Sequence, residues 1–158
     1  MTISEIVHCD TNGIELWRSE NLRNVFHIQG EEFFLKALFT QAIIPGSYYV
    51  GLDNRLTINK ADIPSGLVGE PGGNGYSRQA VSTAGGFGAT YDSGKWNVKS
   101  ITLLFNATGA GWGPVRNAFL TTATGNSGKL ISSVALLSPR TMTAGQTLTF
   151  RFALSLGD

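Results

Sequence analysis

Ten residues near the end of the chain, Thr147–Leu156, alternate between large apolar side chains and small or polar ones. That period of two is typical of a β-strand with one buried face. Other short runs rich in aromatic and β-branched residues precede it, at residues 48–52, 76–82, 96–105, 115–122 and 130–137. Glycine, with 20 of 158 residues, separates these runs, and no helical segments alternate with them. The pattern predicts an all-β protein, an antiparallel sandwich or barrel.

Residues 31–42 are the exception and are predicted to form one short helix. Phe34 and Leu38 recur at helix spacing, and acidic residues occupy the N-terminal end, where the helix dipole favours them. With Phe33 and Phe39, the segment holds more aromatic surface than one narrow stripe can bury. The helix is therefore either clamped against the sandwich or docked on another subunit.

Residues 1–30 differ in composition from the rest and are predicted to form a separate N-terminal arm, beside a sandwich domain of residues 31–158. Within the arm, Thr11-Asn12-Gly13 lies between apolar-rich runs, and Asn-Gly there predicts a hairpin. Residues 59–68 are predicted to be a loop with at most a single helical turn.

Charge excludes several classes of partner. Charged residues are 15% of the chain, against about 25% in typical soluble domains, and the net charge is +1. Phosphate backbones and anionic lipids need clustered Lys and Arg, but the 12 basic residues here are scattered. We therefore expect no nucleic-acid partner and no membrane partner. No apolar run has the length of a membrane span and no signal-peptide pattern is present, so we expect synthesis in the cytoplasm.

Catalytic, cofactor and metal sites find little support in the sequence. The glycine clusters at residues 109–114 and 88–96 lack the spacing of dinucleotide and phosphate loops. A single cysteine, Cys9, and two histidines are too few for a structural zinc site. We expect no enzyme activity, no cofactor and no metal, with a small hydrolase that uses His8 or His27 as a remote alternative.

Aromatic side chains in or near loops suggest a different role. Trp96, Trp112 and Tyr91 are candidates for stacking against a carbohydrate, although core and loop-anchoring roles are more common for such residues.

About 110 residues from Tyr48 onward resemble a family of small structural proteins of tailed bacteriophages. The resemblance is carried by residues 48–52, 70–79, 105–108, 112–115 and 143–148, of which Glu-Pro-x-x-x-Gly-Tyr-x-Arg, from Glu70 to Arg78, is the most specific. It implies a virion protein with a jelly-roll-like β fold that self-associates, often as a trimer, and attaches to a capsid or tail surface. The family pattern begins close to the helix, so residues 1–30 depart from it.

Our leading hypothesis is a capsid decoration or cement protein, a homotrimer bound to the major capsid protein or another virion protein. The alternative is a tail-fibre or tail-tip module that binds host glycan. Under the leading hypothesis, a chain without residues 1–30 folds but no longer binds particles. The predicted assembly residues are Trp17, Phe26, Phe33, Phe34, Phe39, Glu70 and Arg78.

Overall fold

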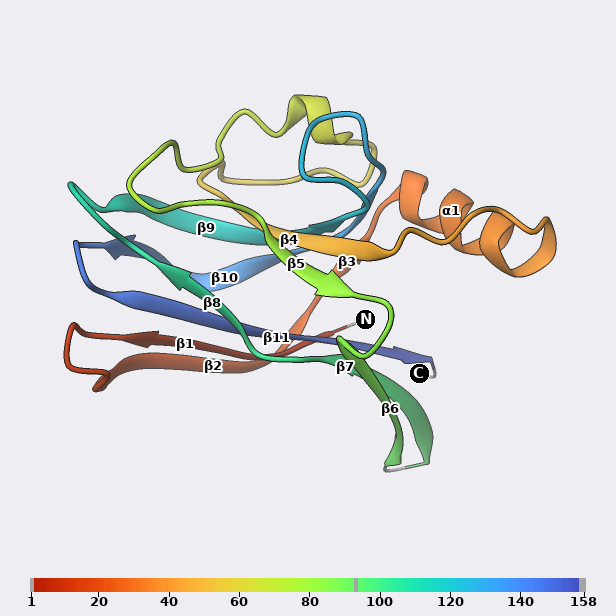
Figure 1. Ribbon diagram of the computed structural model, residues 1–158, viewed down its shortest axis with the longest axis horizontal. Coiled ribbons are helices and arrows are strands. Elements are labelled where there is room, and N and C mark those ends of the chain that lie inside the picture. The colour runs from red at the N-terminus through yellow and green to blue at the C-terminus, as the bar shows by residue number, and fades with distance from the viewer. Residues whose placement is uncertain (1, 93, 157–158) are drawn as a thin grey trace.

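Two antiparallel β-sheets pack face to face in the computed structural model, which describes residues 2–92 and 94–156 (Figure 1). The first sheet has the strand order β2-β1-β11-β7-β6, with β8 also paired to β11. Its strands are β1 (Thr2–Cys9), β2 (Glu15–Arg23), β6 (Phe87–Asp92), β7 (Lys95–Ser100), β8 (Leu103–Asn106) and β11 (Thr147–Leu156). The second sheet has the order β3-β10-β9-β4-β5. Its strands are β3 (Val25–Phe26), β4 (Ser47–Asp53), β5 (Gln79–Ser82), β9 (Trp112–Thr121) and β10 (Leu130–Met142). The predicted all-β antiparallel sandwich is confirmed.

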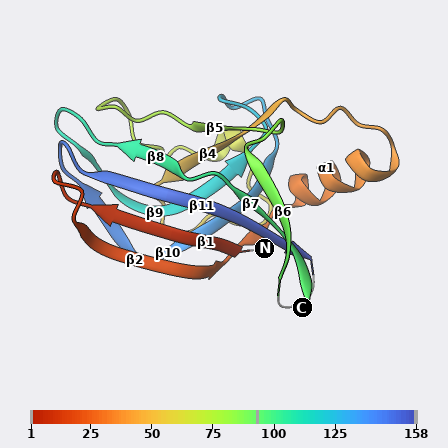
Figure 2. The same cartoon turned by 60° about the horizontal axis from the view of Figure 1, so that its bottom comes forward.

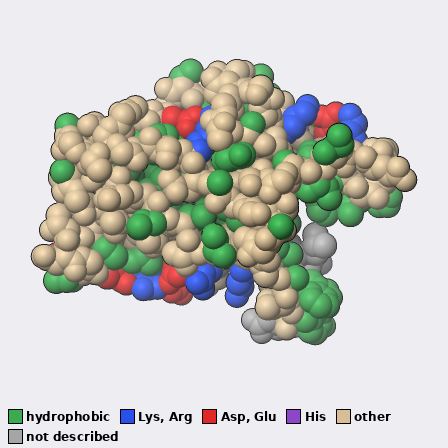
Figure 3. Space-filling view, viewed as in Figure 1, with side chains coloured by type: hydrophobic (Ala, Val, Ile, Leu, Met, Phe, Trp, Pro, Cys, Tyr) green, Lys and Arg blue, Asp and Glu red, His purple; other side chains and the backbone are tan. Residues whose placement is uncertain are grey.

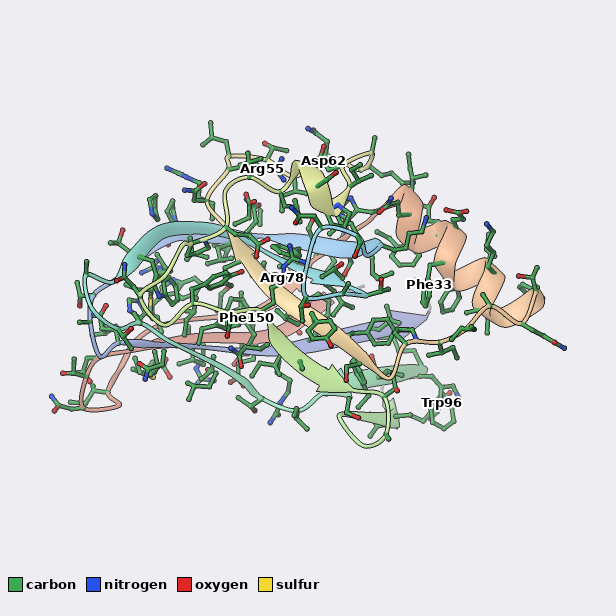
Figure 4. The ribbon with its side chains drawn as sticks, turned by 45° about the horizontal axis from the view of Figure 1, so that its top comes forward. Phe33, Arg55, Asp62, Arg78, Trp96 and Phe150 are labelled. Carbon is green, nitrogen blue, oxygen red and sulfur yellow. The ribbon has the colours of Figure 1, made fainter. Side chains whose placement is uncertain are left out.

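The core lies between the two sheets. The predicted alternation of β11 is present, since Leu148, Phe150 and Phe152 are buried while Arg151 is exposed. Phe150 lies in the interior (Figure 4), where its ring meets that of Phe105 edge to face at 5.6 Å. Such pairs add to the apolar burial that stabilises the sandwich.

The predicted hairpin in the N-terminal segment is confirmed, but it does not form a separate arm. Asp10 Oδ1 accepts hydrogen bonds from the backbone amides of Asn12 and Ile14, both at 2.8 Å, and closes the turn. Strand β1 pairs with β11 along its length, and Figures 1 and 2 show β1, β2 and β11 side by side. Ile6 is fully buried in the core. The structure therefore places the hairpin inside the sandwich, and removal of residues 1–30 would expose the edge of β11.

Helix α1 (Ile28–Phe39) starts three residues before the predicted segment and also ends three residues before its end. The early start follows from His27, which is buried and hydrogen-bonded at the N-terminal boundary of the helix. A short 3-10 helix, η1 (Pro64–Gly66), is the single helical turn predicted within residues 59–68. In the described part of the chain, neither helix is long and apolar enough to cross a membrane.

Strands β4 and β9 differ from the predicted limits by one to three residues at their ends, and three other predicted strands differ more clearly. The run at 96–105 is divided into β7 and β8, because the Ser100 hydroxyl accepts a hydrogen bond from the Phe152 amide at 2.9 Å and donates to the Ile101 carbonyl at 2.7 Å. The register against β11 shifts there by one residue. Tyr76 lies outside β5, since its amide closes a turn with the Gly73 carbonyl at 2.9 Å. Strand β10 extends to Met142, beyond the predicted end at 137.

Candidate assembly interface

An apolar pocket opens at the end of the sandwich where α1 meets both sheets. Its volume is about 410 Å³, and aromatic and aliphatic side chains dominate its walls. The lining residues are Phe26, Gly30, Phe33, Phe34, Tyr48, Thr83, Phe87, Val98, Leu120, Ile131, Phe152 and Leu154. Three of the predicted assembly residues, Phe26, Phe33 and Phe34, are therefore brought together in one wall.

The aromatic rings of this wall form a series of edge-to-face pairs. The ring centroids of Phe26 and Phe34 lie 6.4 Å apart and those of Phe33 and Tyr48 lie 6.2 Å apart, and each pair packs edge to face. Tyr48 in turn meets Phe87 at 5.9 Å. Burial in this apolar setting raises the pKa of the Tyr48 hydroxyl. The series links β3, α1, β4 and β6, so that the pocket wall is continuous with the core.

Helix α1 is held against the second sheet by a close backbone approach. An added Cβ at Gly30 would lie 2.3 Å from the Ile131 carbonyl oxygen of β10, so only glycine permits this spacing. The Gln29 side-chain oxygen accepts a hydrogen bond from the Leu130 amide at 2.9 Å. Phe33 projects from α1 on the side that faces the sheets (Figure 4). These contacts fix the direction in which the helix leaves the sandwich.

His27 anchors the start of α1. Its Nδ1 lies 3.2 Å from the Lys60 carbonyl oxygen, and its Nε2 lies 2.8 Å from the Ser133 hydroxyl. Burial lowers the pKa of His27, and the Lys60 hydrogen bond and the charge of Asp62 oppose this effect in part. If Nδ1–H donates to the Lys60 carbonyl, Nε2 of the neutral ring accepts a hydrogen bond from the Ser133 hydroxyl.

Charged side chains of α1 are paired within the chain. Lys60 lies 2.6 Å from Glu31, and Glu32 lies 2.6 Å from Lys36 and 3.5 Å from Lys129. The helix is thus tied by ion pairs to the loop after β4 and to the start of β10. Because these pairs are largely exposed, their contribution to stability is small.

Large apolar side chains of α1 and of the following turn remain exposed. We call this group the apolar rim, and it consists of Ile28, Leu35, Leu38, Phe39, Ile43 and Ile44. Phe39 is 77% exposed and Ile43 is 91% exposed. Figure 3 shows apolar side chains gathered along the lower side of α1, across a hollow from those of the β6–β7 hairpin. Contiguous exposed apolar surface of this kind marks an interaction site.

The candidate glycan residues are separated by the fold. Tyr91 and Trp96 face each other across the β6–β7 hairpin, with ring centroids 5.6 Å apart, and are 64% and 60% exposed. Trp112, in contrast, is buried at 7% exposure, and its indole N–H donates to the Asn74 carbonyl at 3.2 Å. The Asn74 side-chain amide also donates to the Gly111 carbonyl at 2.9 Å, so two glycine-rich loops form one unit around Trp112. The prediction of Trp112 as a glycan contact is therefore wrong, since its ring is needed to fill the core.

Glu70 and Arg78 pair within the chain. Arg78 Nε donates to Glu70 at 3.0 Å, a second guanidinium nitrogen also contacts that carboxylate, and Nη1 donates to the Ala123 and Gly125 carbonyls at 3.0 and 2.8 Å. The Arg78 side chain is only 5% exposed. Tyr76 donates its hydroxyl to Glu70 at 2.7 Å. In this structure Glu70 and Arg78 therefore bridge parts of one chain, and their role in assembly stays a prediction.

Trp17 also lies apart from the pocket. It is on strand β2, where the Arg140 guanidinium lies 4.2 Å from the centre of its ring. This stacking covers part of the indole and accounts for its partial burial. Trp17 is therefore a packing residue of the sandwich in this structure.

Neither histidine has the surroundings of a catalytic base. His27 and Ser133 are both buried, and a backbone carbonyl rather than a carboxylate orients the ring. His8 Nε2 lies 3.2 Å from the side-chain oxygen of Gln146. Among residues 2–92 and 94–156, no group of three or more His, Cys, Asp and Glu side chains is placed to hold a metal ion.

Several residues of the site were not predicted. Ile43 and Ile44 precede Pro45-Gly46, and two large apolar residues in a segment that cannot continue a helix are the signal that could have identified them. Phe87 stands alone among glycine and small residues, and nothing in its local sequence indicates a place in the pocket wall.

A family model described as podophage GP4 fiber I protein gp80 matches residues 34–154. The match runs from the middle of α1 to β11 and confirms the resemblance to structural proteins of tailed bacteriophages. Among curated proteins, none matches the chain. The N-terminal hairpin lies outside the matched span, although it completes the first sheet.

Proposed function

Since the chain belongs to the family of podophage GP4 fiber I protein gp80, it is a structural protein of the phage virion, and we propose that it is a building block of the virion's fibre. The observation that carries the proposal is the extent of the match, which includes nearly all of the second sheet and most of the first. The family's description names a fibre protein, which favours this role over capsid decoration.

The geometry supports a structural role in assembly. A rigid sandwich with a paired and buried Arg78 network presents one end that carries an open apolar pocket and an exposed apolar rim. Neither histidine has the orientation or access that nucleophilic catalysis needs. The family's description as a fibre protein supports the proposal of a non-enzymatic role.

The location of the protein in the virion tests this proposal. Gold-labelled antibody against the purified chain is applied to intact particles and imaged by electron microscopy, and purified empty heads are tested separately for binding. Label on the fibres and no binding to heads is the expected result. Label spread over the head surface, with saturable head binding, would establish a decoration protein instead.

Glycan binding is a second candidate function, now supported only by the exposed Tyr91–Trp96 pair. Exposed aromatic rings on a projecting hairpin suit stacking against sugar rings. Binding on a glycan array that is lost in Trp96→Ala but retained in Leu137→Ala would support it. A blank array for the wild-type chain would remove it.

A further inference from the structure

The apolar end of the molecule carries a hollow and a projection beside each other. The hollow is the pocket of about 410 Å³, and the projection is the end of α1 with the turn that follows, residues 39–44. From this arrangement we infer that residues 39–44 of one copy dock into the apolar pocket of a second copy of the same chain. The inference deepens the proposed function and rests on it, because it names the partner of that site within a fibre.

The pocket suits an apolar protein segment. Its volume falls within the range of about 300–1,000 Å³ that is typical of sites which bury a ligand. Five phenylalanines line it, and the exposed Thr83 is also among the lining residues. Phe39 and Ile43 are apolar side chains of the kind that such walls bury favourably. Charged or strongly polar ligands would lose their hydration there without compensation.

The turn after α1 presents its side chains outward. Gln41 has a φ of 55°, in the left-handed region that is uncommon for residues other than glycine. The helix ends at Phe39, and Thr40 caps it with a hydrogen bond from its amide to the Lys36 carbonyl at 2.9 Å. The chain thereby reverses direction within a few residues and leaves Phe39 and Ile43 at the outside of the bend.

The exposed area is appropriate for a contact between copies. The exposed fractions of Leu38, Phe39, Ile43 and Ile44, at the end of α1 that carries the turn, together equal about three complete side chains, or ~450 Å² at ~150 Å² each. With the pocket walls beside them, this approaches the ~800 Å² per partner of a standard protein interface. The neighbouring charges of Glu31, Glu32 and Lys36 are paired within the chain, so burial of the rim leaves none of these three without a partner.

A surface with both a hollow and a projection is self-complementary, which favours a second copy over an unrelated protein. Each copy can insert its own turn and receive the turn of its partner, as a two-fold contact between identical subunits requires. Because the contact is apolar, its strength should not fall at high salt, unlike a contact held by exposed ion pairs.

Sedimentation velocity of the full chain across a wide range of concentrations tests the inference. The wild-type chain should form a concentration-dependent oligomer at both low and high salt, and Phe39→Lys and Ile43→Lys should each abolish it. Leu137→Lys is the matched control, because Leu137 is also 77% exposed but lies on β10 outside the pocket and rim. A monomeric wild-type chain at all concentrations, or an equal loss in Leu137→Lys, overturns the inference.

Cross-linking tests the specific contact. In a Cys9→Ser background, chains with Ile43→Cys are mixed with chains that carry Thr83→Cys at the pocket, so that any disulfide between the two variants joins two copies. Oxidation should yield this mixed dimer, whereas Leu137→Cys with Thr83→Cys should not. Equal cross-linking in both mixtures, or none in the first, contradicts docking of the turn into the pocket.

The two proposals fail in different ways. A monomeric chain that is still found on the fibres by antibody labelling overturns the self-contact and leaves the fibre role standing. An oligomer that passes the cross-linking test but labels the head overturns the fibre role alone. If the Phe39→Lys variant lost fibre labelling but kept the oligomer size of the wild type, the self-contact would be overturned and the surface would be assigned to a contact with a different virion protein.

Discussion

Replacement of Arg78 by alanine should be among the most damaging single changes in the protein. The guanidinium pairs with Glu70, donates to the carbonyls of Ala123 and Gly125, and lies 5.1 Å from the centre of the Phe119 ring. In Arg78→Ala the Glu70 carboxylate, whose side chain is only 19% exposed, loses its charge partner, and two carbonyls lose their donor. Removal of one partner from a buried pair costs about 3–5 kcal/mol.

The assay is thermal unfolding followed by circular dichroism. At roughly 2–4 °C per kcal/mol for a chain of this size, the melting temperature should fall by about 6–20 °C. Because the hydrogen bonds of Arg78 to Glu70, Ala123 and Gly125 lie within the chain, the oligomer size measured below the melting temperature should not change. Glu70→Gln should cost less, since it keeps an acceptor for the guanidinium and for the Tyr76 hydroxyl.

Arg18→Ala is the control for burial. Arg18 also contacts several carboxylates, those of Glu5, Glu15 and Glu20, but its side chain is 41% exposed. Exposed pairs contribute little to stability even when their geometry is good. If Arg78→Ala lowers the melting temperature no more than Arg18→Ala does, the argument from burial is refuted.

Two further predictions concern the N-terminal part of the chain. A chain without residues 1–24 should show no cooperative unfolding transition, since it lacks Ile6 and Leu22 from the core and exposes the edge of β11; a melting temperature close to that of the full chain would contradict this. The pKa of His27 is lowered in the folded state, so the unfolded state binds a proton at this residue more readily. The stability that depends on the neutral ring should therefore be complete above the unfolded pKa of about 6.5. It should decrease as the pH falls below that value. Urea titrations between about pH 5 and 7 should show this slope in the wild type and a flatter one in His27→Gln, and equal slopes would refute the assignment.

The sequence predicted those elements whose signals are local. The alternation of residues 147–156 gave the strand limits of β11 without error, and Asn-Gly at residues 12–13 gave the hairpin, because side-chain period and turn chemistry act within a few residues. The break at Ser100 and the early start of α1 at Ile28 depend on hydrogen bonds to Phe152 and to Lys60, which lie far away in the chain. No local pattern encodes such partners.

The sequence identified only some of the residues that line the pocket, for the same reason. Phe33 and Phe34 were recognised as surplus aromatic surface on a helix, which is a local property. The place of Phe33 in the pocket wall depends on its contact with Tyr48, which in turn contacts Phe87, and these two residues belong to strands of different sheets. Trp112 was predicted to be exposed because it lies in a glycine-rich segment. Its ring is buried instead, and its indole N–H donates to the carbonyl of Asn74 in another loop.

The limits of the family match bear on where the site belongs in the chain. The match begins at residue 34, yet Phe26, Gly30 and Phe33 precede it and all three line the pocket. Gly30 also sets how closely α1 approaches β10, so the direction of the rim depends on a residue before the matched span. The matched span therefore supplies most of the sandwich and most of the apolar rim, and the segment before it shapes the surface that we propose joins one copy to another.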